Sequence, residues 1–108
     1  MRRALMMVAG LAGALVAPVA GAQQEGDPAT GRRLAEAWCS NCHVIGPGAS
    51  GPALDAVPTF PAVARMPSTT VMSLRVFLRT PHSGMPDIQM SREQTDDIIA
   101  CIVGLRDR

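Results

Sequence analysis

The segment Cys39-Ser40-Asn41-Cys42-His43 decides the fold of this 108-residue chain. Its two cysteines are three positions apart, so on a helical turn their thiols lie on one side, and a histidine follows directly. Cys-x-x-Cys-His is the attachment pattern of c-type haem. Both thiols can bind one edge of a porphyrin while the imidazole faces the iron from the same side. The motif therefore predicts one covalent haem c, attached through Cys39 and Cys42, with His43 as an iron ligand.

The motif alone leaves two other uses of these cysteines open. A structural zinc site needs four ligands, of which the motif supplies three and His82 offers a further one. A thiol-disulfide oxidoreductase would place Cys39 at the start of a helix within a strand-helix-strand unit. The sequence before Trp38 contains no alternating β-branched strand, which disfavours that enzyme.

The composition indicates that something other than side chains fills the core. Aromatic residues make up only 3% of the chain, although hydrophobic residues reach 47%. Aromatic side chains normally dominate the packing energy of a small core, and a porphyrin would supply the missing flat apolar surface. The formal net charge is +1, with ten arginines and no lysine. This balance excludes a strongly basic surface for nucleic acid.

The first 22 residues have the layout of a secretory signal. Two arginines precede the apolar segment 4–16, and Ala20-Gly21-Ala22 is a cleavage pattern. Removing these 22 of the 108 residues leaves one domain of 86, residues 23–108, without a membrane span; two arginines are lost, so the net charge becomes −1. An uncleaved anchor is the alternative, because residues 4–22 approach the length of a spanning helix. The expected location is the periplasm of a Gram-negative bacterium.

Helix signals occur in three segments of the remaining chain, and no segment alternates as a strand does. Each begins with a capping residue and continues with apolar residues spaced three or four apart. The expected helices are residues 28–38 after the cap Asp27, the segment from a cap at Ser68 or Thr69 to about Arg79, and the segment after the cap Ser91.

Loops are expected at 44–67 and 82–90, where proline and glycine recur. So long a first loop is reasonable if it wraps a cofactor. Its expected inward-pointing residues are Phe60, Val63 and Met66. The apolar face expected for the second helix consists of Val71, Leu74, Phe77 and Leu78. The sequence thus predicts an all-α fold of three main helices, with long loops wrapped round a covalent haem.

The second axial position of the iron has three candidate ligands. Met85 lies in a loop and is followed by Pro86, which fixes the backbone, so its sulfur can be presented across the haem face. Met90 directly precedes the cap Ser91, where a hydrophobic residue usually packs on its helix. His82 would give a bis-histidine site. The sequence favours Met85 and leaves Met90 and His82 open.

Over most of residues 27–106 the chain resembles the small bacterial class I cytochromes c. The resemblance rests on five short motifs in matching order: Gly31, Cys39 to His43, Gly51-Pro52-Ala53-Leu54, Met85-Pro86, and the helix around Asp97 to Ile102. It implies a cytochrome c fold in which the two terminal helices cross, with Ile98 packed over Gly31. It also implies that the Pro52 carbonyl accepts a hydrogen bond from Nδ1–H of His43, which orients the ring.

The function that the resemblance implies is a periplasmic, monomeric, monohaem electron carrier rather than an enzyme. Its partners would be redox proteins such as a dehydrogenase, an oxidase or a bc-type complex. The main alternative is the haem c subunit of a periplasmic dehydrogenase or oxidase complex; a ligand-binding haem protein and the thiol oxidoreductase are further ones.

Overall fold

The computed structural model describes residue 13 and the ranges 25–47, 56–81 and 83–108. Within these ranges the chain forms helices and no strand, so the expected all-α class is confirmed. The helices are α1 (Pro28–Trp38), α2 (Phe60–Arg65), α3 (Val71–Phe77) and α4 (Arg92–Val103). The expected signal sequence lies outside the described residues, apart from Gly13. None of the helices in the described ranges has the length and apolar character needed to span a membrane.

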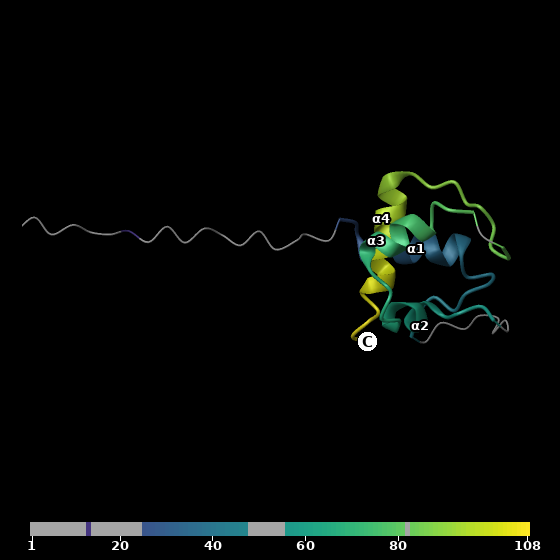
Figure 1. Cartoon of the computed structure of the whole chain (residues 1–108), viewed down its shortest axis with the longest axis horizontal. Coiled ribbons are helices and arrows are strands. Elements are labelled where there is room, and N and C mark those ends of the chain that lie inside the picture. Colours follow the sequence, from purple (N-terminus) through teal and green to yellow (C-terminus); the bar gives the residue numbers. More distant parts are fainter. Residues whose placement is uncertain (1–12, 14–24, 48–55, 82) are drawn as a thin grey trace, which may run out of the picture.

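The crossing of α1 and α4 is the main packing contact of the fold (Figure 1). It depends on Gly31, because a Cβ atom there would overlap the Asp97 carbonyl and lie 2.9 Å from the Ile98 nitrogen. The two backbones approach this closely only where no side chain separates them. A second tie is the hydrogen bond from the Asp27 N–H to Oδ1 of Asp97, at 2.7 Å. The expected packing of Ile98 over Gly31 is confirmed.

Local capping chemistry sets the starts of α1 and α4, as the sequence predicts. The Asp27 carboxylate accepts hydrogen bonds from the N–H groups of Ala29 and Thr30 in the first turn of α1. Ser91 accepts from the Gln94 N–H at 3.1 Å, and the Gln94 side chain accepts from the Ser91 N–H at 2.9 Å. Beyond this cap, α4 is buried continuously from Thr95 to Ile102.

The expected cap of α3 at Ser68 or Thr69 is wrong, because Thr70 holds that position. Its hydroxyl accepts from the Ser73 N–H at 3.0 Å, and the Ser73 hydroxyl accepts from the Thr70 N–H at 2.8 Å. Thr69 is buried, and its hydroxyl donates to the Val63 carbonyl instead. This bond ties the entry of α3 to α2.

The expected loop 44–67 contains the short helix α2. Its cap is Thr59, whose hydroxyl accepts from the Ala62 N–H at 3.2 Å. Phe60 is buried and Val63 packs against the core, both as predicted. Met66 is not an inward anchor, because the backbone turns to an extended conformation there and leaves the side chain 43% exposed.

Two loop segments extend to the same end of the molecule. Two parts of the chain project to the right in Figure 1: the segment 39–47, which follows α1, and the described residues 79–81 and 83–90 between α3 and α4. They carry the Cys-x-x-Cys-His motif and Met85, respectively. The segments that carry the motif and Met85 thus extend to one side of the crossing of α1 and α4.

Candidate haem-attachment site

A single tight turn at the end of α1 presents the cysteines and the histidine. Cys39 caps the helix, and its N–H donates to the Ala35 carbonyl at 2.8 Å. The N–H groups of Cys42 and His43 then both donate to the Cys39 carbonyl, at 3.1 and 2.9 Å. Both cysteines carry free thiols and are partly buried. The helix end therefore fixes the backbone from which both sulfur atoms and the imidazole project.

The His43 ring is oriented by a backbone carbonyl and an aromatic neighbour. Its Nδ1 lies 2.7 Å from the Pro58 carbonyl oxygen, and the centroids of the His43 and Phe60 rings are 5.4 Å apart. The Phe60 N–H donates to the Val44 carbonyl at 2.9 Å, which fastens the start of α2 beside the motif. Since a carbonyl only accepts, Nδ1 is the donor in this contact, and Nε2 is the ring nitrogen that could bind a metal.

The proline that contacts His43 is not the one that the sequence suggested. Pro52 falls in residues 48–55, outside the described part of the chain, whereas the described acceptor is Pro58. Pro58 was not among the residues predicted to contact His43, because the resemblance pointed to Pro52 alone. Thr59 followed by Pro61 is a helix-start signal, and it could have shown that the chain turns back at this point.

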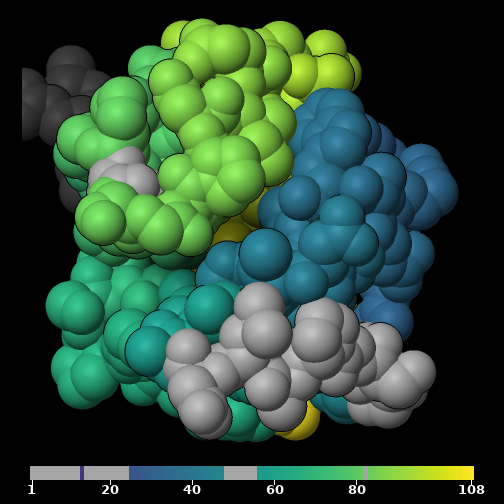
Figure 2. Space-filling model, turned by 90° about the vertical axis from the view of Figure 1, so that its right-hand side faces the viewer, coloured from purple at the N-terminus to yellow at the C-terminus, as the bar shows by residue number. Residues whose placement is uncertain are grey.

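The segment 83–90, which carries Met85, lies at the same end of the molecule as the motif. Figure 2 views this end of the molecule directly: the green segment 83–90 and the blue residues of α1 and the motif border a recess, in which yellow C-terminal residues are visible. Met85 is partly buried. Met90 packs against the hydrophobic core, as expected for the residue before a helix cap. His82 lies outside the described residues.

The apolar side chains near these segments fit a large flat cofactor. Trp38, next to the motif, is 36% exposed, and Phe77, at the end of α3, is 50% exposed. Of the apolar face predicted for α3, Leu74 is buried, Val71 and Leu78 pack against the core, and Phe77 is exposed. Two of the three aromatic residues are thus exposed on a chain that has few of them. Within the described ranges, no three His, Cys, Asp or Glu side chains form a group that could hold a metal ion.

The folded chain holds the Cys39 thiol in its protonated form at neutral pH. Burial, with smaller contributions from the nearby Cys101 and Cys42 thiols, raises the pKa of Cys39 to about 11. Burial also raises the pKa of Cys101, which lies in α4. A protonated thiol is a poor nucleophile, so the folded arrangement does not itself activate Cys39.

Comparison with known proteins decides the family. The chain is 41% identical over 80 residues to cytochrome c-552 of Bradyrhizobium diazoefficiens, and the match covers 74% of this chain and 76% of that protein. The chain is a c-type cytochrome. No family model matches it, and no solved structure does. The cytochrome carries haem c, attached covalently through Cys39 and Cys42, and it functions in electron transfer.

This assignment accounts for the site as it stands. A cytochrome needs both thiols for thioether bonds, so neither the zinc site nor the thiol oxidoreductase is required to explain the motif. The imidazole of His43 follows the two cysteines directly, and its Nδ1 is held by the Pro58 carbonyl. Trp38, beside the motif, and Phe77 are exposed aromatic side chains.

Proposed function

We propose that this cytochrome is an exported electron carrier whose iron is bound by His43 and Met85. The observation that carries the proposal is the shared face: His43, with Nδ1 bonded to Pro58, and the Met85 loop lie at one end of the molecule. Met85 is placed in a loop between two anchored helices, whereas Met90 is packed into the core.

Each residue of the proposed site has a separate role. Bound haem supplies a reversible one-electron couple of its iron. His43 would supply one ligand of the iron, and its hydrogen bond to Pro58 would fix the ring and raise its basicity. The Met85 thioether would supply the second ligand and favour the reduced state. With both ligands supplied by the protein, no site would remain for a substrate, as expected for a carrier rather than an enzyme.

The location and the partners follow from the sequence. The layout of residues 1–22 supports export to the periplasm, where the protein would begin at Gln23. Its partners would be other redox proteins, met in small and transient contacts. Since the mature charge is −1 and lysine is absent, steering by a strongly cationic face is not expected. N-terminal sequencing of the purified protein tests the cleavage site.

The ligand assignment is tested by absorption spectroscopy of the ferric protein. The weak band near the red end of the spectrum that reports an Fe–S(Met) bond should be present in the wild type and absent from Met85→Ala. Met90→Ala and His82→Ala are the matched controls and should keep the band. The proposal is wrong if Met85→Ala keeps it, or if the reduced wild type binds carbon monoxide readily.

A further inference from the structure

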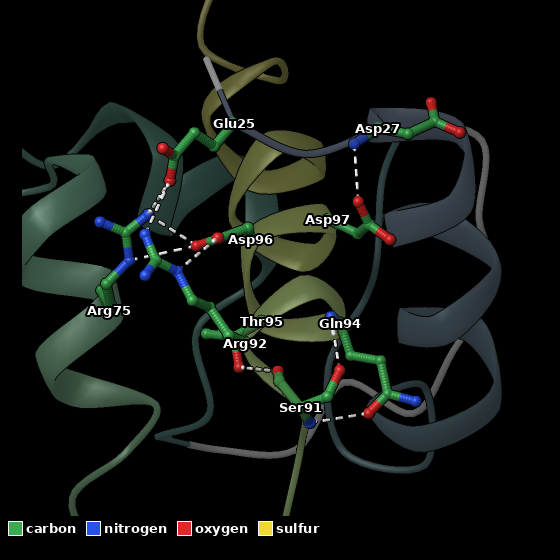
Figure 3. A network of polar contacts seen from close by, with 9 residues as sticks. All are labelled: Glu25, Asp27, Arg75, Ser91, Arg92, Gln94, Thr95, Asp96 and Asp97. Atoms are coloured by element: carbon green, nitrogen blue, oxygen red, sulfur yellow. Dashed lines mark hydrogen bonds and ion pairs between the residues drawn. The ribbon is translucent and has the colours of Figure 1, made fainter.

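A buried ion pair joins α3 to α4 (Figure 3). Arg75 of α3 donates to Oδ1 of Asp96 twice, from Nη2 at 2.6 Å and from Nε at 3.1 Å. The Asp96 side chain is only 8% exposed and the Arg75 side chain 19%. Without Arg75, the buried Asp96 carboxylate would keep only the more distant and exposed Arg92 as a partner, so the pair couples the two helices at this point.

The other members of the network contribute less. Arg92 approaches Asp96 at 3.7 Å from a side chain that is 70% exposed. Glu25 reaches Arg75 and Arg92 at 3.4 Å, and its side chain is 60% exposed. Exposed ion pairs of this kind are worth little in water. The contact between Arg75 and Asp96 therefore carries the coupling, and the outer pairs serve as internal controls.

The coupled helices are those that bracket the Met85 loop. The chain leaves α3 at Phe77 and enters α4 at Arg92, so the loop begins and ends on the two elements that the ion pair joins. Leu78 and Met90, at the two ends of the loop, both pack against the hydrophobic core. They also line one small cavity of about 80 Å³, together with Ile88 and Thr95. The two ends are thus held side by side, and the residues between them carry Met85.

We propose that Arg75 and Asp96 are positioning residues for the axial methionine. By fixing α3 against α4, the pair fixes the distance between the two ends of the Met85 loop. This distance determines what fraction of the time Met85 is dissociated from the iron. This inference rests on the proposed ligation by Met85. It requires no contact of Arg75 or Asp96 with haem, because both act through the ends of the loop.

The experiment measures how readily imidazole replaces the methionine in the ferric holoprotein. Added imidazole binds the iron only when Met85 has left, so its apparent affinity reports the population of the open loop. The variants are Arg75→Gln and Asp96→Asn, and Arg75→Lys is the conservative one. We expect imidazole affinity to rise about tenfold in the first two and less in Arg75→Lys, because a point charge restores part of the pair. If Arg75→Gln does not fold, Asp96→Asn, which keeps the shape of the side chain, carries the test.

Two kinds of control separate positioning from general weakening. Arg92→Gln and Glu25→Gln remove exposed members of the same network and should change the affinity less than about twofold. Gly31→Ala weakens the fold at the other helix crossing and should lower the unfolding midpoint without a comparable rise in affinity.

The outcomes keep the two proposals apart. If the wild type shows the Fe–S(Met) band but the Arg75 and Asp96 variants bind imidazole as the wild type does, the positioning role is wrong and the ligation stands. The positioning role is also wrong if Gly31→Ala raises imidazole affinity as much as the Arg75 and Asp96 variants do for the same loss of stability. If the wild type lacks the band, Met85 is not the ligand and both proposals fall.

Discussion

Cys101 is the thiol that haem attachment does not use. It is 7% exposed, and burial raises its pKa, an effect that Arg32 opposes and Glu36 reinforces. At neutral pH the folded protein therefore holds Cys101 protonated and unreactive. Iodoacetamide should alkylate Cys101 in the native holoprotein at no more than about one tenth of its rate in the denatured protein. Folding raises this pKa, so the denatured protein loses the thiol proton at lower pH than the folded protein does. The free energy of unfolding should therefore be constant below the ordinary thiol pKa and should fall as pH rises from there through the raised pKa of the folded state. Equal alkylation rates would contradict the burial.

Phe60 links the motif to the hydrophobic core. It is 5% exposed, its ring lies against His43, and its N–H is bonded to Val44. Phe60→Ala removes a buried aromatic side chain and should lower the free energy of unfolding by about 3–5 kcal/mol, measured by urea titration of the holoprotein. Phe60→Leu keeps most of the apolar volume and should cost much less. A loss below about 1 kcal/mol in the alanine variant would show that haem, not Phe60, supports the imidazole.

At the crossing of α1 and α4, the two helices are too close for any side chain at Gly31. At most solvent-exposed helix positions, replacing glycine by alanine stabilises by up to about 1 kcal/mol. At Gly31 the added Cβ would overlap the Asp97 carbonyl, which is backbone and cannot swing aside. Gly31→Ala should therefore destabilise the holoprotein by about 1–3 kcal/mol, seen as a lower thermal midpoint. An unchanged or higher midpoint would show that the helices separate at little cost.

The elements could be predicted as far as their signals were local. Asp27 and Ser91 cap their helices with hydrogen bonds that span only a few residues, and both were correctly identified. The cap of α3 was missed because Thr69 and Thr70 are equally able to cap, and the hydroxyl of Thr69 is taken by a residue six positions earlier. Pro58 and His43 are 15 residues apart, so the local signal at Thr59 and Pro61 could have placed the start of α2 but not the contact between Pro58 and His43.

At the scale of the whole molecule, we expect the polypeptide to fold poorly without haem. The helices within the described ranges have 11, 6, 7 and 12 residues, lengths at which isolated helices are marginal, and two of the three aromatic residues are exposed. Covalent haem supplies apolar surface at the end where both loops meet, so its binding energy becomes folding energy. The double variant Cys39→Ala with Cys42→Ala should show less helix by far-UV circular dichroism and no cooperative melting. Cys101→Ala, which removes a thiol outside the motif, should keep both haem and a cooperative transition. A double variant that melts cooperatively at the wild-type midpoint would mean that these short helices hold the fold without the porphyrin.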